Sequence, residues 1–152
     1  MFRLGLFCLL IFVASNVISQ VDYNEFKKKF PLTCTKFDDE SVLESQRVLD
    51  SLNQYEITGG RELFLNNYAT TYYFRYGKWG SIEDLKMAIE YYEKGYKEFN
   101  TSGFAWSLTL YEKLGECEKA LKYLDIYLEL RKKEGIEIDY EQVYYVQRNC
   151  CN

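Results

Sequence analysis

The stretch that decides the fold runs from Thr101 to Glu134 and reads TSGFAWSLTLYEKLGECEKALKYLDIYLELRKKE. Apolar residues recur at helical spacing on both sides of Gly115. Such spacing indicates amphipathic helices, and a glycine between two of them favours a helix end followed by a turn. The stretch therefore predicts two helices, about residues 103–114 and 116–133, folded back on each other as a hairpin.

The flanking sequence carries similar helix signals. Glycine pairs or single glycines interrupt the apolar pattern, and Ser81 with Asp84, like Asp139 with Gln142, resembles a capping box. Further helices are expected at about residues 38–55, 61–76, 81–99 and 139–149. No segment shows sustained alternation of apolar and polar residues between hairpin turns. We therefore expect an all-α fold of about six helices with no sheet.

An internal repeat underlies this pattern. The segments Tyr76–Gly80 and Tyr111–Gly115 share the pattern Tyr-x-x-x-Gly at a separation of 35 residues. Downstream, Ala88-Ile89 and Ala120-Leu121 also match each other, at a separation of 32 residues. Repeats of this period are typical of stacked helical hairpins.

The sequence here resembles the tetratricopeptide repeat family, best over residues 101–134 and in degenerate form over residues 68–100. Phe104, Tyr111, Gly115, Ala120 and Leu124 stand at that family's large, turn and small positions. The resemblance implies stacked antiparallel helical hairpins, a fragment of an α-solenoid, with a concave face lined by first-helix residues. Its groove positions in the best unit are Ser102, Ala105, Thr109, Glu112 and Lys113.

The N-terminus has the layout of a secretory signal peptide. Arg3 precedes an apolar run from Leu4 to Val13, and small and polar residues follow. Cleavage is expected after Ser15 or Ser19, with Ser19 preferred. The predicted organisation is a signal peptide over residues 1–19, an extended or partly helical arm over residues 20–37, and one helical domain over residues 38–152, without a membrane anchor after cleavage.

The composition argues against several classes of function. The chain has a net charge of −4 and no histidine. An acidic chain lacks the positive field that nucleic-acid binding needs, and the absence of histidine removes the commonest general base and metal ligand. We expect no catalytic, cofactor or metal site.

Four cysteines remain after the predicted cleavage: Cys34, Cys117, Cys150 and Cys151. An even number in a secreted chain indicates disulfides. The last helix should return antiparallel along the helix that begins near Cys117, so Cys150 or Cys151 should reach Cys117. The sequence does not indicate which cysteine pairs with Cys34.

These observations predict a secreted or periplasmic protein that binds another protein or a peptide, such as an adaptor or an immunity protein. A basic partner fits the acidic chain, and Trp79 and Trp106 join the groove positions as candidate contacts. The alternative is a carrier that holds a small apolar ligand inside a helical, disulfide-tied shell, because the chain has 15 tyrosines and 10 phenylalanines.

Overall fold

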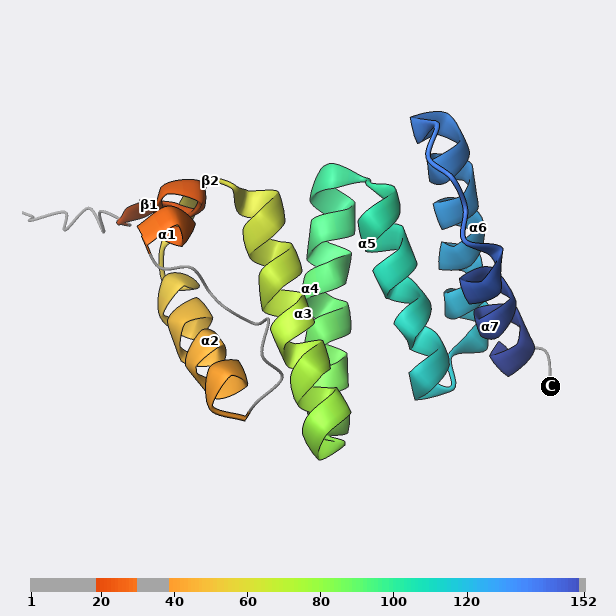
Figure 1. Ribbon diagram of the computed structural model, residues 1–152, viewed down its shortest axis with the longest axis horizontal. Helices are drawn as coiled ribbons and strands as arrows, with labels where there is room; N and C mark the ends of the chain where they lie inside the picture. Colours follow the sequence, from red (N-terminus) through yellow and green to blue (C-terminus); the bar gives the residue numbers. More distant parts are fainter. Residues whose placement is uncertain (1–18, 30–38, 151–152) are drawn as a thin grey trace, which may run out of the picture.

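A computed structural model of the chain describes residues 19–29 and 39–150. The elements, in chain order, are β1 (Gln20–Asp22), α1 (Tyr23–Lys29), α2 (Asp39–Leu52), β2 (Glu56–Gly59), α3 (Arg61–Trp79), α4 (Ile82–Phe99), α5 (Ser102–Ser107), the 3-10 helix η1 (Leu108–Leu114), α6 (Cys117–Glu134) and α7 (Tyr140–Cys150). Figure 1 shows them side by side along the long axis, with α3 and α4, and then α5 with η1 and α6, running antiparallel. None of the described helices has the length and apolar character needed to span a membrane.

The described residues include a small sheet, which the sequence did not predict. β1 pairs in parallel with β2, and Val21 lies opposite Ile57. The expectation of a fold without a sheet is therefore wrong. Each strand is only three or four residues long, too short to show an alternating pattern, and the pairing joins segments 36 residues apart.

The segment after β1 belongs to the core. Tyr23 in α1 is fully buried, with its ring 5.3 Å from that of Phe64 in a T-shaped pair. Its hydroxyl accepts a hydrogen bond from Asn67 Nδ2 at 2.9 Å. The predicted arm thus begins as a strand and a helix that pack on α3. Its residues 30–38 and the signal-like residues 1–18 lie outside the described residues.

Helix ends follow the predicted signals. Ser81 Oγ accepts a hydrogen bond from the backbone N–H of Asp84 at 3.3 Å, which caps α4. Gly80 and Gly115 adopt left-handed φ values of 71° and 74°, where a side chain would be strained. The chain can therefore reverse directly between α3 and α4 and between η1 and α6.

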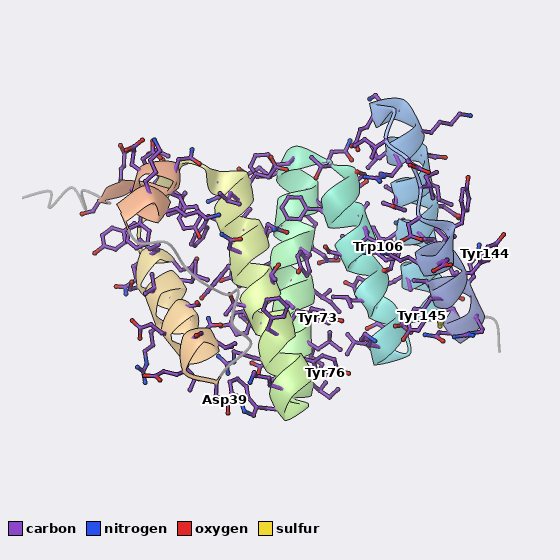
Figure 2. The ribbon with its side chains drawn as sticks, in the orientation of Figure 1. Asp39, Tyr73, Tyr76, Trp106, Tyr144 and Tyr145 are labelled. Carbon is purple, nitrogen blue, oxygen red and sulfur yellow. A yellow bond between two sulfur atoms is a disulfide. The ribbon has the colours of Figure 1, made fainter. Side chains whose placement is uncertain are left out.

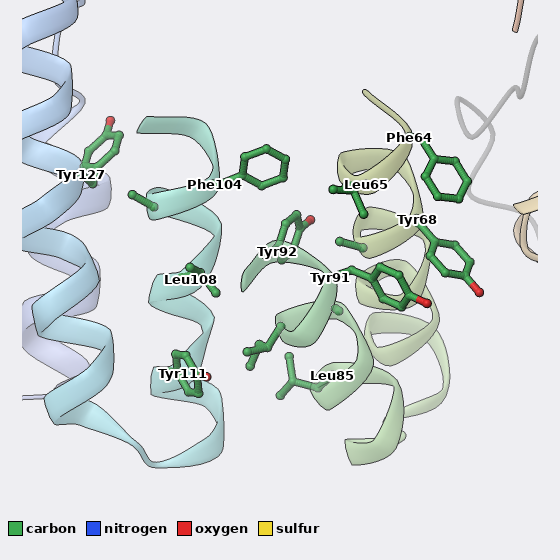
Figure 3. Packing of buried hydrophobic residues seen from close by; sticks show 14 of the residues in the cluster. Phe64, Leu65, Tyr68, Leu85, Tyr91, Tyr92, Phe104, Leu108, Tyr111 and Tyr127 are labelled. Carbon is green, nitrogen blue, oxygen red and sulfur yellow. The ribbon is translucent and has the colours of Figure 1, made fainter. Parts of the chain in front are cut away.

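Aromatic rings fill the core between helices. Tyr68 of α3 makes T-shaped contacts with Tyr72, at 5.4 Å, and with Tyr91 of α4, at 4.3 Å. In Figure 3, Phe104 projects from α5 toward α4. There it occupies the space that a side chain at Gly95 would need. A single buried cluster consequently extends from α1 to α7.

The predicted cysteine bridge is present. Cys117 at the start of α6 is bonded to Cys150 at the end of α7, with their Cα atoms 5.1 Å apart. The antiparallel return of the last helix is confirmed by this pairing. Cys34 and Cys151 lie outside the described residues.

Candidate functional site

A cleft of about 300 Å³ opens between α3, the α5–η1 segment and α7. We call it the groove. Its walls come from three parts of the fold, and Tyr92 of α4 lies beneath them. The wall residues are Tyr73 of α3, Trp106, Leu110, Glu112 and Lys113 of α5 and η1, and Tyr145 of α7. Figure 2 labels Tyr73, Trp106 and Tyr145 on one face of the molecule. Residues far apart in the sequence thus converge on one surface.

Trp106 forms one aromatic wall of the groove. Its ring lies 5.1 Å from that of Tyr127 on α6, and its side chain is half-buried. Its backbone carbonyl accepts a hydrogen bond from Thr109 Oγ1 at 2.8 Å, near the point where α5 tightens into η1. The indole is thereby held by packing on one side and remains partly open to solvent on the other.

Two opposite charges lie together in the groove. Lys113 Nζ is 3.3 Å from Glu112 Oε1, and Asn149 Nδ2 donates to Glu112 Oε2 at 3.1 Å. Burial lowers the pKa of Lys113, but the hydrogen bond to Glu112 and its negative charge outweigh burial and raise that pKa overall. Because the two charges compensate each other, this part of the groove has no net charge near neutral pH.

The floor of the groove is closed by Tyr92 and Val146, which are both buried. Tyr92 Oη and Thr70 Oγ1 share a hydrogen bond of 2.9 Å. Burial, the largest effect, raises the pKa of Tyr92, so its hydroxyl stays neutral at physiological pH. The groove therefore has an aromatic and apolar floor, partly exposed aromatic walls and a compensated charge pair.

Three of the predicted contact residues are buried. Ser102, Ala105 and Thr109 are 5 %, 0 % and 4 % exposed, so they do not form an exposed face. The backbone N–H of Ser102 donates to Glu134 Oε1 at 3.1 Å, and its hydroxyl donates to Glu134 Oε2 at 2.5 Å. The hydrogen-bonding groups of Ser102, which was expected to contact a partner, are therefore already bonded to this carboxylate at the end of α6.

The expected helix over residues 103–114 is also divided, which affects the direction of its side chains. It is an α-helix only to Ser107 and a 3-10 helix from Leu108. A 3-10 helix has three residues per turn, so each side chain advances farther round the axis than in an α-helix. Thr109, just after this change, borders the groove with its hydroxyl already bonded to the backbone.

Of the other predicted contacts, Glu112, Lys113 and Trp106 line the groove. Trp79 is 45 % exposed at the end of α3 and does not belong to the groove lining. Tyr73 and Tyr145 were not predicted from the sequence, because neither stands at a family groove position of the best-matching unit.

Residues 19–29 and 39–150 contain no grouping of potential metal ligands. No three His, Cys, Asp or Glu side chains of this part lie together in a way that could hold a metal ion. The groove lining contains one carboxylate, Glu112, and it is already paired. The expectation of a chain without cofactor or catalytic residues stays a prediction.

Comparison with known proteins gives no relative from which to assign this site: the chain matches no described protein family, no curated protein and no solved structure.

Proposed function

We propose that this protein binds a segment of another protein in the groove and catalyses no reaction. The observation that carries the proposal is the partly exposed pair of aromatic walls, Tyr73 and Trp106, over a preformed cleft. Aromatic side chains in such positions are the usual anchors of protein interfaces. The tetratricopeptide-like interpretation is part of this proposal, because α3 and α5 would be the first helices of two successive hairpins, whose shared side binds partners in such arrays.

The chemistry of the groove favours an apolar or aromatic anchor on the partner. Leu110, Trp106 and Tyr73 offer apolar surface, while Glu112 and Lys113 compensate each other. A basic partner is supported by the overall charge of −4 but not by this compensated pair. We therefore place the apolar anchor in the groove and expect any attraction of a basic partner to act through the wider acidic surface.

A segment fits the groove better than an enclosed small ligand, the alternative function. A carrier buries most of its ligand in a largely closed cavity. The groove is instead bordered by side chains such as Tyr145, which is 46 % exposed. Access from solvent along this edge supports binding of a chain that enters and leaves the cleft.

We also propose a secreted or periplasmic location. The signal-like residues 1–19 and the Cys117–Cys150 bridge support it together, because structural disulfides persist in oxidising compartments.

Selection from a displayed peptide library, followed by affinity measurements on the oxidised protein, tests the binding function. Selected peptides should share an apolar or aromatic anchor and should lose at least about tenfold in affinity with Trp106→Ala or Tyr73→Ala. Tyr55→Ala is the matched control, because Tyr55 is 42 % exposed beside β2 and does not line the groove. Circular dichroism verifies that each variant is folded. Peptides that bind all three variants as tightly as the natural chain would contradict a function in this groove.

A further inference from the structure

The outward face of α7 carries aromatic residues where a solvated helix would carry charges. Val143 and Val146, each 3 % exposed, turn toward the core. At about 100° per residue, Tyr144 and Tyr145 lie on the opposite side of the helix. They are 67 % and 46 % exposed, and Tyr140 beside them is 59 % exposed. Three exposed tyrosines on one short helix form a patch typical of contact surfaces.

Two opposite charges frame this patch symmetrically. Glu141 lies three residues before Tyr144, and Arg148 lies three residues after Tyr145. The four residues follow the spacing i, i+3, i+4, i+7, which places them on one stripe of a helix. They also line a shallow cleft of about 450 Å³ on the outer surface. Within the described part of the chain, the side chains of Glu141 and Arg148 have no ion pair with each other or with a neighbour.

This order of residues complements itself when reversed. If a second α7 packs antiparallel about a two-fold axis midway between Tyr144 and Tyr145, residue numbers that sum to 289 face each other. Glu141 then faces Arg148 of the other copy, and Tyr144 faces Tyr145. Both charge pairs are attractive, whereas a parallel arrangement in register would oppose like charges. We propose that the outward face of α7 binds a second copy of this chain in that antiparallel arrangement.

The small size of the patch indicates a weak dimer. At about 150–250 Å² for a whole tyrosine, the exposed fractions of Tyr140, Tyr144 and Tyr145 amount to roughly 300–400 Å² of surface per copy. A stable interface buries about 800 Å² on each partner. The dimer is therefore a weak one, with a dissociation constant on the order of 100 µM. The dimer face shares Tyr145 with the groove lining.

Charge reversal tests the arrangement by sedimentation equilibrium of the oxidised protein between about 10 µM and about 1 mM, which brackets the dissociation constant expected from the buried area. The apparent molecular mass of the natural chain should rise with concentration from that of one copy toward that of two. Glu141→Arg alone and Arg148→Glu alone should each weaken association at least about tenfold, because every charge pair becomes repulsive. An equal mixture of these two variants should associate again, because Glu141→Arg faces the glutamate introduced at 148, and Arg148 faces the natural Glu141.

The mixture separates a specific contact from a folding defect, since two misfolded variants do not repair each other. Glu129→Arg, an exposed position on α6, is the control for a change of net charge and should associate as the natural chain does. The proposal is overturned if the natural chain keeps the mass of one copy up to about 1 mM, the upper end of the range set by the estimated interface. It is also overturned if each single variant associates normally, or if the mixed variants stay apart.

Discussion

Gly95 of α4 is the position where one added methyl group should destabilise the fold most clearly. An ideal Cβ at Gly95 would lie 2.2 Å from Cε1 and 2.3 Å from Cζ of Phe104. Carbon atoms in contact prefer about 3.5–4.0 Å, so either the ring or the helix must move by more than about 1 Å. Phe104 is only 3 % exposed, and its ring lies 6.5 Å from that of Tyr92 and 6.3 Å from that of Phe99. The ring is thus enclosed and has little room to move.

Two opposing effects decide the magnitude for Gly95→Ala. Replacing glycine by alanine inside a helix stabilises it by about 0.8–1 kcal/mol. Overpacking a tight core costs about 1–3 kcal/mol and more where rings cannot move. With a gap this short, the cost belongs at the upper end of that range. The free energy of unfolding should fall by about 1–2 kcal/mol in total.

Urea unfolding of the oxidised protein measures this effect, with Gly77→Ala as the matched control. Gly77 also lies in a helix, but a Cβ there meets nothing within 4 Å. That variant should gain about 0.5–1 kcal/mol, so the two substitutions should differ in sign. Phe104→Leu combined with Gly95→Ala should show less than the sum of the two separate losses, because the smaller side chain relieves the clash. Equal stabilisation by alanine at both glycines would refute the close packing of α4 on α5.

Three further predictions concern the cross-link, the Glu134 carboxyl group and two buried tyrosine hydroxyls. Cys117→Ser should lower the free energy of unfolding by about 3–4 kcal/mol, because the bridge spans 33 residues, and denaturant unfolding with and without reductant should give this difference only for the natural chain. Hydrogen bonds from Ser102, chiefly that of its hydroxyl, lower the pKa of Glu134, so the carboxylate stabilises the fold above the ordinary glutamate pKa, and this stabilisation is lost as pH falls through the folded pKa. Glu134→Gln should therefore be less stable than the natural chain at pH 7, and the difference should shrink toward pH 3. Thermal unfolding at both pH values measures this. Burial is the largest cause of a raised pKa at Tyr68 and Tyr111, so these hydroxyls stabilise the fold below about pH 10, and this stabilisation is lost as pH rises through their folded pKa values. A tyrosinate titration should show a late-ionising group of tyrosines that appears together with loss of helical circular dichroism. A single transition near pH 10 in a folded chain would contradict this.

The helix positions could be predicted because their ends depend on local chemistry. Ser81 caps α4 by a hydrogen bond to the third residue after it, and Gly115 ends η1 by its own backbone angle. Both signals lie within a few residues of the end that they define. The Cys117–Cys150 bridge was also accessible, since its prediction needs only two helix lengths and one reversal between them.

The missed elements depend on partners distant in the chain. The strands β1 and β2 exist because Val21 and Ile57 lie opposite each other, and neither strand has a local pattern of its own. The change from α5 to η1 at Leu108 preserves a roughly helical spacing of apolar residues, so it leaves no clear mark on the sequence. In both cases tertiary packing decides between conformations that the local residues allow.

The groove shows the same division within a single helical segment. A family position predicts where a residue lies on a helix, but its exposure depends on what the neighbouring helix places against it. Ser102 and Glu112 both stand at family groove positions. The Ser102 hydroxyl nevertheless donates to Glu134 at the end of α6, while Glu112 remains at the groove beside Lys113. Tyr145 illustrates the converse, because it has no groove position in the best unit and reaches the groove only because α7 folds back against η1. A groove assembled by several separate parts of the chain is therefore best predicted from contacts between helices, with the sequence pattern supplying the candidates that those contacts then expose or bury.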